Sequence, residues 1–177
     1  EIRNLLLEKA SADFDGSEIS PTIFGAVFES TRNPETRRSG GMHYTSIENI
    51  HKVIDPLFLD DLKNELKEIQ QITVQKTKDK KLRDFQTKLS NLRWLDPASG
   101  SGNFLTETYI SIRRLENEVI KELQRGQITF GFNESSPIHV SIDQFYGIEI
   151  NDFAVTVAKT ALWIAESQMK KDTEAIV

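Results

Sequence analysis

The chain has 177 residues, of which 38% are hydrophobic and 28% charged, as expected of one good-sized folded domain or a domain with an appendage. It contains no cysteine, which excludes disulfides and thiolate metal sites and is compatible with a cytoplasmic protein. No apolar run reaches about 18 residues and no signal-peptide pattern is present, so we expect neither a membrane span nor secretion.

Acidic residues outnumber basic ones, and the net charge is −5. A protein that binds nucleic acid by itself usually carries a basic surplus, so we do not expect this chain to supply a main DNA-binding face. We interpret its basic clusters, Arg37 with Arg38 and the run from Lys76 to Arg83, as solvated surface. The chain begins without methionine and ends at KKDTEAIV without a closing element, so we expect a piece of a longer protein.

Residues 1–91 predict a helical region. Ser20 can cap a helix that begins at Pro21. Thr45 or Ser46 can cap a later helix, and Glu48 takes the capping-box position if Thr45 is the cap. Apolar residues recur at the helical spacing of three and four in three groups: Ile47, Ile50 and Ile54; Leu59, Leu62, Leu66 and Ile69; Leu82, Phe85, Leu89 and Leu92.

The pattern changes at residue 92. RWLDP predicts a short strand that ends at Pro97. A long amphipathic helix is expected over 103–123, because apolar residues recur there every three and four positions. Residues 127–144 carry two short β-like runs around a Gly/Asn/Ser/Pro turn, which predicts a hairpin-like insertion.

FYGIEI, residues 145–150, predicts a second strand. The last helix follows, with Asn151 or Asp152 as its cap and with Phe153 and Trp163 expected in the core. Strand, glycine-rich turn, helix, strand, helix is the start of a βαβα unit. We therefore predict an α/β fold with a helical region over 1–91 and, over 92–177, a partial Rossmann-like domain with a truncated parallel sheet.

The stretch DPASGSGN, residues 96–103, is the most informative part of the chain. Gly100 and Gly102 permit positive φ and leave the backbone bare, and the following helix offers free N–H groups. Such a turn suits a ligand with carboxylate, ribose or phosphate oxygens. No Gly-Lys-Ser/Thr follows, which excludes a Walker A loop, and Leu105 in the third glycine position disfavours a dinucleotide site.

Glu149 lies at the end of the second predicted strand, where an acid can accept both hydroxyls of an adenosine ribose. It follows Gly102 by 47 residues, against about 20 in the dinucleotide fingerprint. The long helix and the insertion account for the surplus. Alone, the glycines could form a mere tight turn and Glu149 a solvated strand end, but together and in this order they favour ligand binding.

The chain resembles a known family in three segments. DPASGSGNFL resembles motif I of the adenosylmethionine-dependent DNA methyltransferases that modify exocyclic amines, usually DPACGSGNFL, with Ser99 in the position of the Cys. GIEINDFAVTVAKTALWIA is similar to motif II, and FGAVFES with RRSGGMHYTSIENIHKVIDPLF resembles the segment before motif I. This order is that of N6-adenine methyltransferases of restriction–modification or phage-defence systems, including fused methyltransferase–endonucleases, and covers most of residues 20–170.

The resemblance implies S-adenosyl-L-methionine as the cofactor and DNA as the partner of the parent protein. Tyr44 and Thr45 would line the methionine end of the cofactor, and Asp96 would lie near its amino group. Glu149 would bind the ribose hydroxyls, and Ile150 would pack against adenine. The complete set of implied cofactor-binding residues is Tyr44, Thr45, Asp96, Ala98, Gly100, Gly102, Glu149 and Ile150.

The catalytic motif of that family is absent from these 177 residues. The family uses Asn/Asp/Ser-Pro-Pro-Tyr/Phe to hold the target amine and to stack on the flipped base. We therefore assign no catalytic residue and expect the chain alone to be inactive. His43, His51 and His139 lack metal-ligand spacing, so no metal site is predicted. The alternatives are a non-catalytic scaffold module of a defence complex and a methyltransferase that acts on RNA or protein.

Overall fold

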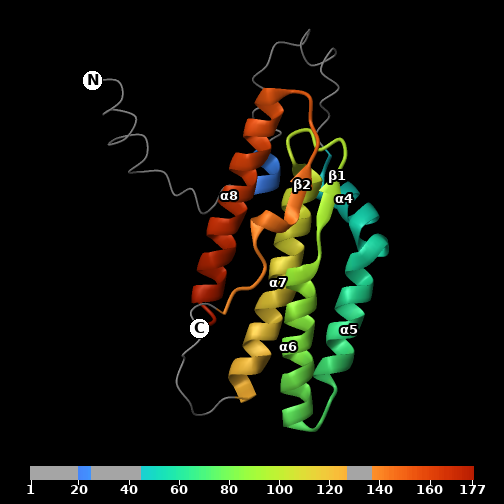
Figure 1. Cartoon of the computed structure of the whole chain (residues 1–177), viewed down its shortest axis with the longest axis vertical. Coiled ribbons are helices and arrows are strands. Elements are labelled where there is room, and N and C mark those ends of the chain that lie inside the picture. The colour runs from blue at the N-terminus through green and yellow to red at the C-terminus, as the bar shows by residue number, and fades with distance from the viewer. Residues whose placement is uncertain (1–19, 25–44, 127–136) are drawn as a thin grey trace, which may run out of the picture.

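A computed structural model describes residues 20–24, 45–126 and 137–177, and every structural statement below concerns these residues. One long helix, α7, lies at the centre, and the other helices and a two-stranded sheet pack around it (Figure 1). The elements are α4 (Ile47–Ile54), η3 (Asp55–Leu59), α5 (Asp60–Gln70), α6 (Gln75–Asn91), β1 (Trp94–Asp96), α7 (Asn103–Gly126), η4 (Ile142–Gln144), β2 (Phe145–Gly147) and α8 (Asp152–Glu174).

The N-terminal helices start where the sequence predicts. The backbone N–H groups of Ile23 and Phe24 donate to the Ser20 carbonyl at 3.1 and 3.0 Å, which forms a helical turn after Ser20. In α4 the cap is Ser46, whose hydroxyl accepts the backbone N–H of Asn49. Because Thr45 is not the cap, the capping box proposed for Glu48 does not form.

The two helices expected around Ile50 and Leu62 form one continuous helical segment. Between α4 and α5 the chain widens into the π-helical turn η3, in which the N–H of Asp60 donates to the Asp55 carbonyl. Pro56 explains the widening, because it has no N–H to continue the α-helical ladder. The apolar face therefore continues from α4 through η3 into α5, and both α4 and α5 pack on α7.

The sheet consists of β1 and β2, which pair in parallel with Leu95 opposite Tyr146. The backbone N–H of Ile148 also donates to the Asp96 carbonyl at 2.9 Å, so the pairing reaches one residue past β2. Helices around a parallel strand pair confirm the predicted α/β class, although β2 is shorter than FYGIEI. The proposed division of the chain at residue 92 stays a prediction.

The predicted insertion forms no strand in the part that the structure describes, so the expected β-like run is wrong there, and the insertion itself stays a prediction. Residues 137–144 form a loop and the 3₁₀ helix η4, and residues 127–136 lie outside the described ranges. The carboxylate of Glu116 on α7 accepts the backbone N–H groups of His139 at 2.6 Å and Val140 at 3.2 Å. Donors that would have formed a strand ladder are thus taken by a buried side chain.

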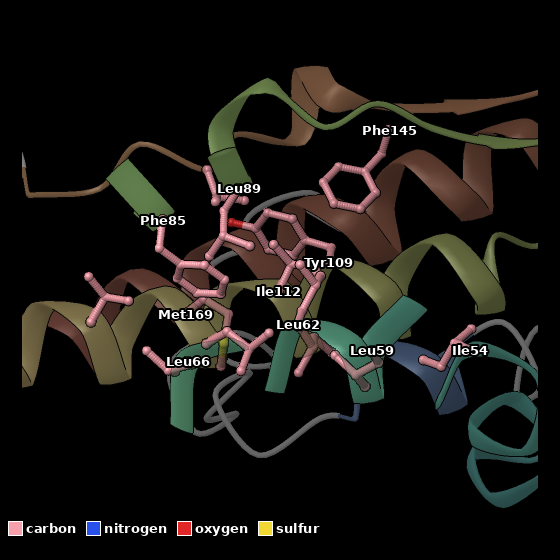
Figure 2. Close-up of a cluster of buried hydrophobic side chains, with 14 of the residues drawn as sticks. Ile54, Leu59, Leu62, Leu66, Phe85, Leu89, Tyr109, Ile112, Phe145 and Met169 are labelled. Carbon is pink, nitrogen blue, oxygen red and sulfur yellow. The ribbon is translucent and has the colours of Figure 1, made fainter. Parts of the chain in front are cut away.

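The core surrounds α7 on several sides. Figure 2 shows Tyr109 and Ile112 of this helix among side chains from the other elements. The ring of Tyr109 meets Phe145 of β2 edge-on, with ring centres 5.4 Å apart. The packing therefore fixes the sheet against the helix that follows the glycine-rich turn. The other labelled members are Ile54, Leu59, Leu62, Leu66, Phe85, Leu89 and Met169.

The expected burial of Phe153 and Trp163 is wrong. They are 41% and 60% exposed, because α8 packs through its small residues instead. Those residues form a stripe at helical spacing, Ala154, Val157, Ala158, Ala161 and Ala165. Small side chains let α8 lie close to α7, and Phe153 and Trp163 lie outside this contact, whereas Met169 of the same helix is buried in the core. No helix in the described ranges is long and apolar enough to cross a membrane.

Candidate functional site

The glycine-rich turn lies at the carboxyl end of β1 and leads directly into α7. Gly100 has a φ of 52° and Gly102 a φ of 80°, both in the left-handed region that favours glycine. The carboxylate of Asp96 accepts the backbone N–H of Ala98 at 3.0 Å, which tightens the start of the turn. The predicted need for positive φ is therefore met at both glycines.

Hydrogen bonds tie the turn to the chain beyond β2. The backbone N–H of Ser99 donates to the Ile148 carbonyl at 3.0 Å, and that of Gly102 donates to the Ser99 carbonyl at 2.7 Å. The Ser99 hydroxyl points to the same Ile148 carbonyl at 3.4 Å. Serine thus fits the position where the family pattern has cysteine, and it adds a polar contact there.

Glu149 meets the turn through its side chain. Its carboxylate accepts the backbone N–H of Gly100 at 3.0 Å and that of Asn151 at 2.8 Å. Asn151 caps α8 through bonds to Phe153 and Ala154, so the acid also lies at the positive end of that helix. Two segments that the sequence predicted to share one pocket are therefore in direct contact.

Two close approaches shape the site, and neither was predicted. A Cβ atom at Gly102 would lie 2.7 Å from the Cβ of Ala158, and one at Gly147 would lie 2.7 Å from the Ser99 hydroxyl. Both glycines therefore leave room for a neighbouring segment. A glycine inside a strand often marks such an approach, so Gly147 in FYGIEI carried a usable signal.

The outer side of the turn is open. A Cβ atom at Gly100 would meet nothing within 4 Å, and the Ile150 side chain is 99% exposed. Bare backbone, an acid fixed beside it and an uncovered apolar side chain match the chemistry of an adenosine with polar substituents. The residues present thus fit the predicted cofactor.

The methionine-end residues are placed less completely. Thr45 is half-buried and directly precedes Ser46, the cap of α4, and α4 packs on α7. Among the described residues, no hydrogen bond joins Thr45 to the turn. Tyr44 lies outside the described residues. The structure therefore brings together Asp96, Ala98, Gly100, Gly102 and Glu149, with Ile150 beside them.

Residues 72–176 match the family described as MmeI, DNA-methyltransferase domain. The chain belongs to this family. DNA methyltransferase A of Bacillus subtilis (strain 168) is 41% identical over 170 residues, which are 96% of this chain and 18% of that protein. The predicted resemblance to restriction–modification DNA methyltransferases is confirmed.

A solved structure agrees with this membership of the MmeI family. The type IIL restriction–modification enzyme MmeI in complex with DNA superposes with a TM-score of 0.78 and 41% identity. The superposition covers 89% of this chain and 20% of that one. The chain thus spans about a fifth or less of the proteins that it matches.

Proposed function

We propose that this chain holds S-adenosyl-L-methionine for a parent enzyme that methylates adenine N6 in DNA. The contact between the Glu149 carboxylate and the Gly100 backbone carries the proposal, because it puts an acid beside a bare glycine turn at the ends of two parallel strands. This is where ligands bind in open α/β sheets, and the arrangement supports a Rossmann-like domain.

The chain's own residues would bind and orient the cofactor. A carboxylate offers about four lone-pair sites, and Glu149 uses one on each oxygen for the backbone of Gly100 and Asn151. Sites therefore remain for two ribose hydroxyls. The uncovered Ile150 would take a face of the adenine, and Asp96 the amino group. When bound, the cofactor supplies an activated methyl group.

Transfer to adenine also requires groups that recognise and flip the base. The Pro-Pro-aromatic motif for that step does not occur in these 177 residues. The catalytic part and the DNA-recognition part of the parent enzyme are therefore proposed to lie in other segments. The net charge of −5 agrees with a chain that serves the cofactor rather than the DNA.

Calorimetry with S-adenosyl-L-methionine on the intact parent protein tests this pocket. Glu149→Ala should weaken binding by at least about tenfold, since charge-assisted hydrogen bonds would be lost. Glu118→Ala, an exposed acid of α7, is the matched control and should leave binding unchanged. Equal affinities of wild type and Glu149→Ala would contradict the site, and no binding by wild type would contradict the function.

A methylation assay separates the proposed enzyme from the alternatives. The parent protein is incubated with methyl-labelled cofactor and, in turn, DNA, RNA and protein acceptors. Label in N6-methyladenine of DNA is the expected result. Cofactor binding without any transfer would favour the non-catalytic scaffold, and label in RNA or protein would change the substrate.

A further inference from the structure

A buried acid on α7 contacts residues of the N-terminal helices. Glu107 is only 4% exposed. One of its carboxylate oxygens accepts the Thr22 hydroxyl at 3.0 Å, and the other lies 3.1 Å from His51 Nε2. These three residues come from separate segments, so the cluster is a tertiary link.

His51 is held from both sides. Its Nδ1 lies 2.8 Å from the Asp55 carboxylate, while Nε2 faces Glu107. Ionised carboxylates only accept hydrogen bonds, so the doubly protonated imidazolium is the form that satisfies both contacts. Lys63 also approaches Asp55, at 3.8 Å. The other charged groups around the cavity beside His51 are Arg114, Glu118, Lys121 and Asp172.

The position of this link relates it to the proposed pocket. His51 is the fifth residue of α4 and lies just past its first turn, and α4 begins directly after Thr45 and Ser46. Glu107 lies just past the first turn of α7, the helix that begins after Gly102. The contact therefore fixes the start of α4 relative to the helix that carries the turn.

We propose that His51 and Glu107 are positioning residues that hold Thr45, directly before α4, against the methionine end of the cofactor. The proposal rests on the proposed function. A helix that is held near its first turn keeps its first residues in a fixed position. The free energy of binding then includes no cost for ordering them. Loss of the contact between His51 and Glu107 should weaken binding of the amino-acid end of the cofactor. Binding of the nucleoside end should not change.

The test uses the full-length parent protein and two ligands. S-adenosylhomocysteine has the amino-acid end, whereas 5′-methylthioadenosine shares the nucleoside and sulfur but lacks it. In His51→Gln and Glu107→Gln, Kd for S-adenosylhomocysteine should rise by about five- to tenfold, within the usual range of coupling between sites. Kd for 5′-methylthioadenosine should stay unchanged.

Thr173→Val is the matched control. It removes buried hydrogen bonds that Thr173 makes to Arg113 and Asn117, and it leaves α4 untouched. It should change the affinity for neither ligand. Glu107→Gln keeps the shape of the side chain and an acceptor for Thr22, so this variant should fold even if His51→Gln does not.

The affinities for the two ligands decide the inference. A loss of affinity for S-adenosylhomocysteine alone supports it. Equal losses of both ligands, or no loss in a folded Glu107→Gln, overturn it and leave a purely structural ion pair. A wild-type protein that binds neither ligand refutes the proposed function instead, so the two failures are distinguishable.

Discussion

The carboxylate of Glu149 lies 3.0 Å from the backbone nitrogen of Gly100, and this bond joins the ends of β1 and β2 across 49 residues of sequence. A second backbone donor, Asn151, fixes the other carboxylate oxygen. The acid is therefore held before any ligand arrives, which lowers the ordering cost of binding. A surface acid with free rotamers would lack this property.

The contact between Gly102 and Ala158 predicts a large cost for a single methyl group. Gly102→Ala combines positive φ with a Cβ placed 2.7 Å from another Cβ, whereas Gly100→Ala meets only the φ penalty. We expect about 2–4 kcal/mol of destabilisation for Gly102→Ala and about 1–2 kcal/mol for Gly100→Ala. Thermal unfolding of the parent protein should rank them in that order.

The double variant Gly102→Ala with Ala158→Gly separates the two terms. Removing the opposing Cβ relieves the 2.7 Å contact and leaves the Cα of residue 158 at 3.1 Å, although the glycine then weakens α8 by about 1 kcal/mol. The unfolding midpoint should recover partly from that of Gly102→Ala. If the destabilisation of the double variant equals or exceeds the sum of those of the two single variants, the contact is not the cause.

The sequence predicted the turn well because its constraints are local. Two glycines, a proline and a helix start dictate the backbone around residues 96–103 whatever packs outside. Glu149 could be placed nearby because the carboxyl ends of parallel strands meet at one edge. The identity of the proposed cofactor came from the resemblance to the methyltransferase family, because no local pattern specifies it.

The predictions that were wrong concern features that tertiary contacts decide. The run before β2 has β propensity, but Glu116 takes its backbone donors from 23 residues away. Trp163 was expected inside because it is apolar, yet an alanine stripe decides which face of α8 packs. The link between His51 and Glu107 spans 56 residues and leaves no pattern in the sequence.

The start of α4 allows a matched pair of variants. Ser46→Ala removes the cap and should cost about 1 kcal/mol of stability. Thr45→Val keeps the shape and the cap, so stability should hold, while affinity for S-adenosyl-L-methionine should fall. Calorimetry and thermal unfolding of both variants give the check; an unchanged affinity in Thr45→Val would remove Thr45 from the site.

The pH dependence of stability follows from His51. Hydrogen bonds to Asp55 and Glu107 raise its pKa above 6.5, against the opposing effect of burial. Since the folded value exceeds the unfolded one, this stabilisation is complete below about pH 6.5 and is lost as pH rises through the folded pKa. Between about pH 6 and about pH 9, the thermal unfolding midpoint of His51→Gln should decline less with rising pH than that of wild type. Parallel curves of midpoint against pH would contradict the ion pair.

The buried pair of Arg113 and Glu116 predicts the most severe single change outside the proposed pocket. Both side chains are fully buried on α7, and Arg113 also donates to the Thr173 hydroxyl at 2.6 Å. Glu116→Ala would leave a buried guanidinium without its counter-charge, which costs about 3–5 kcal/mol. It would also release the backbone of residues 139–140 just before β2.

An exposed pair on the same helix provides the control. Lys121 and Glu118 lie 3.4 Å apart with side chains about half exposed, so Glu118→Ala should cost no more than about 1 kcal/mol. The thermal unfolding midpoint of the parent protein should therefore fall sharply in Glu116→Ala and hardly at all in Glu118→Ala. Equal shifts would mean that burial of the charge pair does not set its contribution. Because the released loop leads into β2, Glu116→Ala should also weaken cofactor binding by displacing Glu149.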